Sequence, residues 1–533
     1  MSGNRVEKVT IVGGGTAGWL AAVTLDTFLN ERRDGPPVQI TLIESPRVPN
    51  IGVGEATVPG MRGLLQRIGI DESVFLLRCN ASFKYGVRFV GWNTDRQGRP
   101  IEFVHPGDAP SMLRGKDPAY HFHHFGRAEG RTDLVDAVVP NHALTIHRRG
   151  PRRPEDPDYS GMIRYAYQID AALFATYLRE VAVSRGVRHI LDDVQQVRLD
   201  ERGFVRELQL ERGGAFPIEF VVDCTGFRGL IIGDALGEPW EPLSRHVLCD
   251  RAVVAQLPHV TPNSCEPCAT ATALGAGWAW NLPLYTRVGT GYVYCSAFRT
   301  DEQAQDEYVR YLTVRGFKVD ESLRIIRMKT GGRRRSWVKN CVAIGLSSAF
   351  VEPLEATAIH SIAVACRHLA SNFPDKSMSP AFAHRFNKSF GELMANIRDF
   401  IVLHYYTSNR DEPFWHAARE DIEVPASLAE NLEIWRHVMP APADITGVNL
   451  FAPWSFLAVL YAKGWYDDTE FPVEGSLARE DWQGYARQMD DLKRRLLAHL
   501  PDNYELLTRI RAKAARRMFG GAPAAAARPA VAN

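Results

Sequence analysis

A glycine-rich turn close to the start of the chain constrains the fold more than any other feature. Residues 9–12 form a short apolar run rich in β-branched side chains, and they lead directly into Gly13-x-Gly15-x-x-Gly18. Apolar side chains recur at helical spacing over residues 17–29, and residues 38–44 are a second strand-like run that ends in Glu44. This order predicts a unit that binds a dinucleotide, with Glu44 on a ribose hydroxyl.

The glycine turn alone is ambiguous, because a tight turn that packs a helix on a sheet uses the same residues. Two later segments strengthen the prediction. Residues 220–226 and 342–346 are apolar strand-like runs that end in small residues. Small residues are needed where the backbone closely approaches a cofactor. Three such turns predict one extended dinucleotide bound to one α/β unit.

Charge and composition exclude several classes of protein. The chain has 63 basic and 62 acidic residues, and the formal charge of +1 gives no field that attracts nucleic acid or an anionic membrane. No apolar run of about 18 residues is present, and the first residues lack a secretory segment. We therefore predict a cytoplasmic protein without nucleic-acid or membrane partners. Eight cysteines in 533 residues are too sparse for a disulfide framework.

The chain is predicted to form one large unit with three parts. Residues 1–400 form the cofactor-binding part, with an inserted substrate-facing sheet and loops at about 80–150 and 240–330. Residues 401–518 form a mainly helical part that covers the substrate, since the helical pattern dominates from about 379 to 504. Residues 519–533 are rich in Ala, Pro and Gly and are predicted to be a disordered tail.

Five motifs, in this order, resemble those of the flavin-dependent tryptophan halogenases. They are residues 13–19, 52–57, 82–84, 277–283 and 350–357, which read GGGTAGW, GVGEAT, SFK, GWAWNLP and FVEPLEAT. The resemblance extends over about residues 6–420, and the C-terminal helical part matches poorly. It implies an α/β fold of the two-dinucleotide-binding type that binds FAD, as in p-hydroxybenzoate hydroxylase, with the mainly helical C-terminal part as a substrate subdomain.

The resemblance implies a reaction in two stages. FADH2, supplied by a separate flavin reductase, reacts with oxygen, and a halide ion (chloride or bromide) is converted to hypohalous acid. The oxidant then moves away from the flavin and halogenates an indole-like aromatic substrate. Homodimer formation stays open.

Trp278 and Trp280 bear on the choice between halogenation and hydroxylation. In a typical aromatic hydroxylase the substrate lies beside the flavin, and two indole rings are bulky enough to fill that volume. The two residues are therefore predicted to exclude the substrate from the flavin, with ordinary core packing as the alternative. Two other functions are weighed against the halogenase: a flavin-dependent aromatic monooxygenase, and a non-catalytic carrier built on the FAD fold.

Lys84 is one of two predicted catalytic residues. Residues 83–89 alternate like a strand, which would aim Lys84 inward together with Gly86 and Arg88. Burial lowers the pKa of an ammonium, so Lys84 would either donate a hydrogen bond to hypohalous acid or, when neutral, form a haloamine. A lysine that extends its charge to solvent is the alternative. The catalytic lysine of the family matches this position.

Glu355 is the second predicted catalytic residue, and it matches the catalytic glutamate of the family. Electrophilic attack on an indole makes a cationic intermediate, which a nearby carboxylate stabilises and from which it can accept the ring proton. Glu352 is assigned a structural role instead, as a carboxylate at a helix N-terminus.

Further residues are predicted to hold the cofactor and the halide. The cofactor residues are Gly13, Gly15, Thr16, Ala17, Gly18, Glu44, Gly54, Ala56, Val194, Leu346 and Ile359. The first N–H groups of a helix point at an anion, so the amides of Thr357 and Ala358 are predicted to hold the halide. The family usually has Ser-Thr-Gly where this chain has Ala356-Thr357-Ala358. A preference for bromide over chloride is our hypothesis for these changes.

The substrate pocket is predicted from aromatic residues. His123 and Phe125 match positions at which the family presents rings to the indole, although His123 also suits a core position, and Phe451 and Trp454 would wall the same pocket. Tryptophan-acting members have a tyrosine pair and a glutamate that grip the amino acid, and residues 441–450 lack both. We therefore predict a simple indole, or an indole within a bulkier partner. The clustered histidines lack suitably spaced carboxylates, so no metal is predicted.

Overall fold

The computed structural model describes residues 4–31, 36–48, 54–319 and 323–520. Two predicted features lie partly outside these residues. The first two residues of the motif at 52–57 are not described, and of the tail at 519–533 only Phe519 and Gly520 are described.

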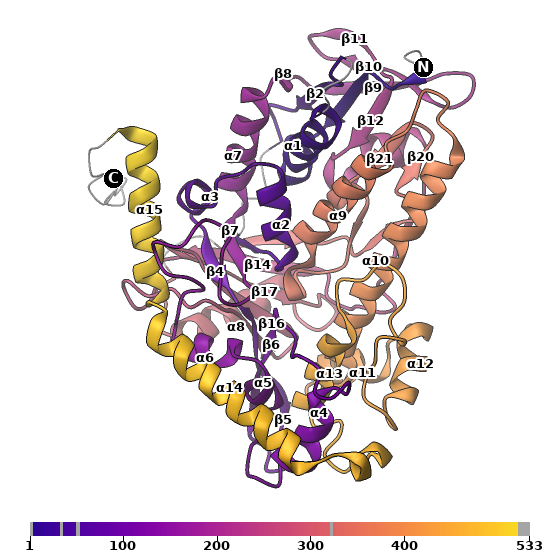
Figure 1. Ribbon diagram of the computed structural model, residues 1–533. Helices are drawn as coiled ribbons and strands as arrows, with labels where there is room; N and C mark the ends of the chain where they lie inside the picture. The colour runs from indigo at the N-terminus through magenta and orange to yellow at the C-terminus, as the bar shows by residue number, and fades with distance from the viewer. Residues whose placement is uncertain (1–3, 32–35, 49–53, 320–322, 521–533) are drawn as a thin grey trace.

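The glycine turn leads from a strand of a six-stranded sheet into a helix, as predicted (Figure 1). The strands of this sheet, in spatial order, are β20 (Trp337–Val338), β21 (Cys341–Ala343), β12 (Phe220–Asp223), β1 (Lys8–Val12), β2 (Gln39–Glu44) and β8 (Arg188–Leu191). All neighbours are parallel except β20 and β21. Helix α1 (Thr16–Asn30) packs against α7 (Ala171–Ser184) and α9 (Thr357–Ser371). The carboxyl ends of the parallel strands meet at one edge, where such sheets bind ligands.

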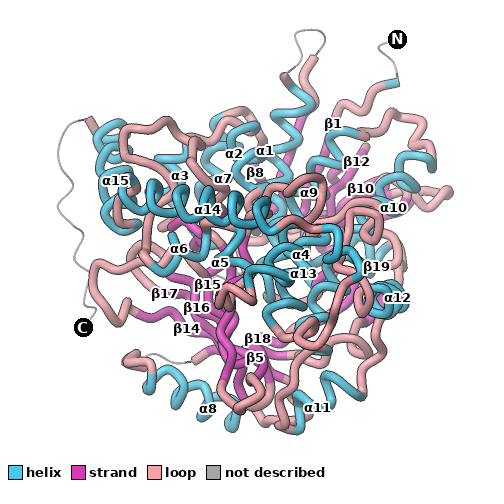
Figure 2. The backbone as a smooth tube through the Cα atoms, turned by 60° about the horizontal axis from the view of Figure 1, so that its bottom comes forward, coloured by secondary structure: helices cyan, strands magenta, loops and turns pink. Residues whose placement is uncertain are grey.

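A second sheet of seven strands lies below the first in the view of Figure 1. In spatial order it contains β18 (Arg324–Arg327), β14 (Arg251–Leu257), β17 (Val288–Tyr294), β16 (Gly277–Pro283), β15 (Ala269–Leu274), β5 (Gly86–Thr94) and β6 (Pro100–Pro106). A small sheet in the order β3 (Gly54–Ala56), β7 (Ala166–Asp170), β4 (Ser82–Lys84) packs on it through β3. Figure 2 shows the strands of the large sheets in the interior, with helices around them.

Shorter elements complete this part of the chain. Two peripheral three-stranded sheets contain β9 (Val194–Leu199), β10 (Val205–Leu210) and β11 (Gly214–Pro217), and β13 (Trp240–Pro242), β19 (Gly331–Arg333) and β22 (Ala349–Phe350). The helices are α2 (Gly60–Arg67), α3 (Glu72–Arg78), α4 (Pro118–His121), η2 (Phe122–Gly126), α5 (Leu134–Val138), α6 (Asn141–Ile146), η3 (Gly226–Arg228), η4 (Leu230–Ala235), α8 (Asp301–Val314), η5 (Gly345–Ser347) and η6 (Leu354–Ala356).

The C-terminal part is mainly helical, as the sequence pattern indicates. It contains α10 (Pro380–Tyr406), α11 (Pro413–Glu420), α12 (Ala426–Ile434), α13 (Pro453–Ala462), α14 (Arg479–His499) and α15 (Asn503–Phe519). The predicted boundary at residue 400 falls inside α10, which packs on α9. Helices α14 and α15 run along one side of the molecule (Figure 1), where α15 packs on α3 and α14 on α5, α6 and η2.

The segment that carries Lys84 differs from the prediction of one continuous strand. It is split at Tyr85 into β4, which belongs to the small sheet, and β5, which belongs to the seven-stranded sheet. The Tyr85 N–H donates to Pro267 O at 2.7 Å, and its carbonyl accepts the N–H of Gly107 at 2.7 Å. These contacts to distant segments end β4, and they leave Lys84 at the junction of two sheets.

A buried carboxylate fixes β7 to α3 beneath this junction. Glu72 is fully buried and accepts hydrogen bonds from the hydroxyls of Tyr165 and Tyr167, both at 2.6 Å. It also accepts the Tyr159 N–H at 2.7 Å and a guanidinium N–H of Arg152 at 3.1 Å. The donors around this carboxylate are themselves buried, and they share Glu72 as their acceptor. The network therefore depends on Glu72.

Candidate active site

Two cavities meet at the junction of the sheets. The long cleft, of about 480 Å³, runs from the glycine turn and Glu44 to the start of α9. The side cavity, of about 300 Å³, lies among β4, the end of β6 and the loop before α13. Lys84, Val87 and Glu355 line both cavities. A group at this boundary therefore faces one ligand compartment on each side.

The long cleft has the features of a dinucleotide site at its glycine end. Gly13 has φ +116°, and a Cβ there would lie 2.2 Å from the Cys224 carbonyl oxygen, so only glycine fits. Gly15 is the N-cap of α1 and makes no side-chain cap, which leaves the first amides of the helix open to an anion. Glu44 lines the cleft at the end of β2 and is bonded to His189 at 2.9 Å.

Ten of the eleven predicted cofactor residues line the long cleft. They are Gly13, Gly15, Thr16, Ala17, Glu44, Gly54, Ala56, Val194, Leu346 and Ile359. Gly18 instead lies behind the turn, where a Cβ would be 1.9 Å from Gly13 O. This residue allows α1 to approach the strand closely, which is the packing role of the third glycine in such turns.

The two indoles of the predicted wall project from β16 on one face of the sheet. Trp278, Trp280 and Leu282 alternate along the strand and all line the long cleft. Trp280 lies over Gly291 of the neighbouring strand, where a Cβ would be 2.2 Å from the ring. Neither tryptophan is among the residues that line the side cavity. The rings therefore occupy the wall of the long cleft alone.

Lys84 is buried, with 5% of its surface exposed. Its ammonium donates a hydrogen bond to Thr57 O at 3.1 Å. Burial lowers the pKa of Lys84, and the charge of Glu355 offsets part of that shift. Inward orientation was predicted from the apolar neighbours of Lys84, and the buried position confirms it.

Glu355 is flanked by two buried imidazoles. Its carboxylate lies 2.8 Å from His105 Nδ1 and 3.5 Å from His404 Nε2. Burial acts to raise the pKa of Glu355, but His105 and His404 together outweigh it and hold the pKa well below the usual range. His404 stacks on Phe89 with ring centroids 4.4 Å apart, which fixes its plane. The carboxylate is therefore a fixed negative charge at the boundary of the cavities.

The backbone around Glu355 has an uncommon conformation. Glu355 and Ala356 have φ values of +63° and +60°, and α9 begins at Thr357. This left-handed turn directs the first amides of α9 and the Glu355 side chain to the same region. Ala358 lines the long cleft, whereas Thr357 is buried and is not among its lining residues.

Comparisons with known proteins identify the family. A family model described as tryptophan halogenase matches residues 8–478. The chain belongs to the tryptophan halogenase family. It is 37% identical to the tryptophan 6-halogenase ThaL of Streptomyces albogriseolus over 83% of this chain and 84% of that protein. It is 35% identical to the tryptophan 7-halogenase RebH of Lentzea aerocolonigenes over 95% of this chain and 99% of that protein.

The fold agrees with this assignment. The structure of Tar14, a tryptophan C-6 flavin-dependent halogenase (chlorinase) from taromycin biosynthesis, superposes with a TM-score of 0.87 at 34% identity. The match covers 95% of this chain and 100% of that chain. The protein is therefore an α/β enzyme of the flavin-dependent halogenase class, as the sequence motifs predicted.

Two predicted substrate residues of this halogenase are not brought to either cavity. His123 Nε2 lies 2.8 Å from Thr469 O and its Nδ1 lies 3.1 Å from the Tyr461 hydroxyl. Phe125 packs beneath Arg479, whose guanidinium carbon lies 4.9 Å from the ring centroid. Helices and loops of the C-terminal part cover both rings, so the geometry does not support their predicted contact with a substrate.

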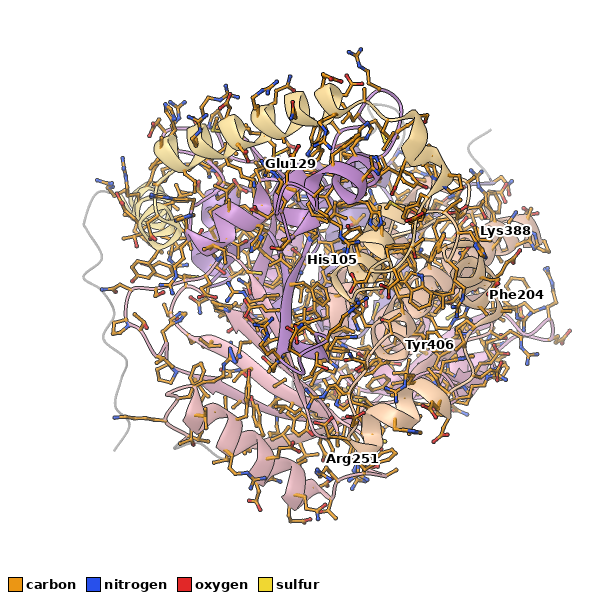
Figure 3. All side chains as sticks on the ribbon, turned by 90° about the horizontal axis from the view of Figure 1, so that it is seen from below. His105, Glu129, Phe204, Arg251, Lys388 and Tyr406 are labelled. Carbon is orange, nitrogen blue, oxygen red and sulfur yellow. The ribbon has the colours of Figure 1, made fainter. Side chains whose placement is uncertain are left out.

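The other predicted substrate residues do reach the side cavity. Phe451 and Trp454 line it, together with His105, which the sequence reasoning missed. His105 lies near the middle of the molecule (Figure 3). Its position could have been suspected, because it ends a strand that pairs with the segment following Lys84. His404 carried no local signal, since it occupies a buried face of α10.

Glu352 corrects a further prediction. It lies five residues before the first residue of α9 and is not a carboxylate at that helix N-terminus. Its side chain is fully buried and accepts hydrogen bonds from the Tyr405 hydroxyl at 3.0 and 3.1 Å. Burial raises the pKa of Glu352 to about 8, with the Tyr405 bond opposing the shift. The residue thus joins the loop before η6 to α10.

Within the described ranges, no group of three or more His, Cys, Asp and Glu side chains is arranged to hold a metal ion. No helix in this same part of the chain is long and apolar enough to span a membrane.

Proposed function

We propose that the protein is an FADH2- and O2-dependent halogenase that makes hypohalous acid in the long cleft and passes it to an arene in the side cavity. One observation carries this proposal: Lys84 and Glu355 line both cavities, whereas Trp278 and Trp280 line the long cleft without lining the side cavity. This arrangement supports oxidant production on one side of the boundary and its consumption on the other. A hydroxylase of the p-hydroxybenzoate hydroxylase type, whose overall fold we expect here, needs its substrate beside the flavin.

FAD is the proposed occupant of the long cleft. The glycine turn and the amides at the start of α1 would hold its pyrophosphate, and Glu44 would contact its ribose. Reduced FAD, supplied by a separate reductase, would provide the electrons that reduce oxygen before the halide is oxidised. The amides of Thr357 and Ala358 would hold the halide, since the N-terminus of α9 favours an anion.

Lys84 and Glu355 would act on the oxidant and on the arene. Among the described residues the Lys84 ammonium has one hydrogen-bond acceptor, Thr57 O, so it retains N–H groups for hypohalous acid. Its lowered pKa also allows the neutral amine that a haloamine requires, and both roles remain open. Glu355 would stabilise the cationic arene and accept the ring proton, while His105 holds the carboxylate in position.

The proposed substrate is a simple indole, or an indole within a bulkier partner. The side cavity has a volume of about 300 Å³, which suits a small aromatic ligand. His105, Phe451 and Trp454 provide ring faces for it. The side-chain amide of Asn396 fixes the main chain of Phe451: its oxygen accepts the Phe451 N–H at 2.9 Å, and its nitrogen donates to Phe451 O at 3.0 Å. The loop that carries it lacks the tyrosines and glutamate expected of a grip on free tryptophan.

The test supplies FAD, a flavin reductase, NADH, oxygen and either bromide or chloride, with indole or tryptophan as substrate. We expect halogenated indole by mass spectrometry, with a higher kcat/KM than for tryptophan, and none without halide. Lys84→Ala should remove halogenation, while Lys388→Ala on the exposed surface (Figure 3) should leave it unchanged. Hydroxylated indole without halide, or full activity of Lys84→Ala, would refute the proposal.

A further inference from the structure

One edge of the side cavity is polar and is not used by the mechanism above. Asp108, Arg164, Asn449 and Ser455 line this edge. Arg164 is exposed, and within the described part of the chain its guanidinium makes no hydrogen bond or ion pair. An unpaired guanidinium beside an aromatic cavity presents five N–H donors in a planar fork.

The pairing of β7 with β4 brings this edge close to the reactive boundary. Ala166 of β7 is the register partner of Lys84 in β4, and both line the side cavity. Arg164 lies two residues before Ala166, just outside β7, and lines the same cavity. Two residues of chain span at most about 7 Å. An arene held at Lys84 and Glu355 would therefore extend a short substituent toward Arg164.

Asp108 carries the opposite charge at this edge but is already engaged. Its carboxylate accepts the N–H of Ala109 at 2.9 Å, and its main-chain carbonyl accepts the Trp454 indole N–H at 3.0 Å. Burial raises the pKa of Asp108, and the Arg164 charge opposes that shift. The two side chains are thus near each other, and Asp108 holds the loop against α13. Among the described residues, the cation available at this edge is therefore the Arg164 guanidinium, beside the neutral side chains of Asn449 and Ser455.

We propose that Arg164 selects arenes that carry a carboxylate on a short arm. The proposal rests on the halogenase function argued above and narrows its substrate class from indoles in general to anionic indoles. The guanidinium would pair with both carboxylate oxygens, while the ring lies among His105, Phe451 and Trp454. Because the arm is remote from the reacting carbon, the pairing acts equally on the ground state and the transition state. It therefore lowers KM and leaves kcat unchanged.

The experiment compares four indoles that differ in the arm: indole, indole-3-acetate, tryptamine and tryptophan. For the unaltered enzyme we expect indole-3-acetate to have a KM about fivefold below that of indole, the upper end for one ion pair at an exposed site. Arg164→Gln should remove that advantage with kcat unchanged, and Arg164→Lys should restore part of it. Arg202→Gln, at an exposed site on a β-hairpin turn, is the matched control and should change neither constant.

Binding provides a readout independent of turnover. Quenching of tryptophan fluorescence should give a tighter Kd for indole-3-acetate than for indole in the unaltered protein, and equal Kd values in Arg164→Gln. The proposal would be overturned if tryptamine had a lower KM than indole-3-acetate. It would also be overturned if the KM of indole-3-acetate stayed below that of indole in Arg164→Gln. In either case, continued halogenation of indole would support the proposed halogenase function. If no arene were halogenated, the halogenase function itself would be refuted.

Discussion

Removing the charge of Glu355 without changing its shape should separate the two stages of the reaction. In Glu355→Gln the amide retains the size of the carboxylate, and its oxygen can still accept the N–H of His105. In the unaltered protein His105 Nδ1 lies 2.8 Å from Glu355 Oε1. What is lost is the negative charge that faces the side cavity. Because Glu355 is buried, that charge acts in a medium less polarisable than water.

The size of the effect follows from Coulomb attraction. A carboxylate about 5 Å from a developing positive charge, at an effective dielectric constant of about 20, stabilises the charge by about 3 kcal/mol. Loss of that stabilisation lowers the rate of the arene step by about 10²-fold. The oxidant-forming step should be unaffected, since it develops no cation in the side cavity.

The assay counts both fates of the oxidant. Free methionine in the reaction traps hypohalous acid that escapes, because the thioether is oxidised to the sulfoxide, and mass spectrometry measures sulfoxide and halogenated indole together. For Glu355→Gln we expect the sum to equal that of the unaltered enzyme while halogenated indole falls about 10²-fold. Glu302→Gln, at an exposed position in α8, is the control. A fall of the sum in step with halogenated indole would refute the reasoning.

Three further predictions concern stability and the halide. Lys84→Met should raise Tm near neutral pH, because burial lowers the pKa of Lys84, so that the unfolded chain binds this proton more readily than the folded protein. The stability of the unaltered protein then rises with pH, and the Tm difference between the two proteins should shrink toward pH values of about 10. A Tm difference that does not change with pH would contradict this. Glu72→Ala should lower the free energy of unfolding, measured in urea, by roughly 4 kcal/mol. Four buried donors lose their acceptor at about 1–3 kcal/mol each, and relaxation of the structure recovers part of that loss. Glu72→Gln should lower the free energy of unfolding by less, because the amide oxygen still accepts hydrogen bonds. With equal bromide and chloride, brominated product should exceed chlorinated product, and Ala358→Gly should reduce the ratio; faster chlorination by the unaltered enzyme would remove the hypothesis.

The elements that local sequence determines were predicted well. The unit β1, α1 and β2 follows from apolar periodicity and from Gly13, whose backbone angle no other residue adopts without strain. The burial of Lys84 followed from its apolar neighbours. The split of its strand at Tyr85 did not, because the two main-chain bonds that cause it come from Pro267 and Gly107.

The parts of the site that depend on distant packing could not be predicted. His105 and His404 meet Glu355 across 250 and 49 positions of the chain, and no local pattern encodes those pairings. Distant packing also explains why His123 and Phe125 do not line either cavity. Their local motif suits a substrate sandwich, but the packing of the C-terminal part covers both rings.

Lys84 and Glu355, two of the three described residues that line both cavities, are held in locally unfavourable states. A left-handed conformation at a residue with a side chain costs about 1–2 kcal/mol, and Glu355 and Ala356 adopt it in succession. Lys84 is a buried ammonium with Thr57 O as its hydrogen-bonded acceptor. With ordinary helical angles at 355 and 356, α9 would begin earlier and direct the carboxylate differently around the helix axis. Surrounding contacts such as that of His105 therefore maintain the strain, and the strain keeps opposite charges at the point where the compartments meet.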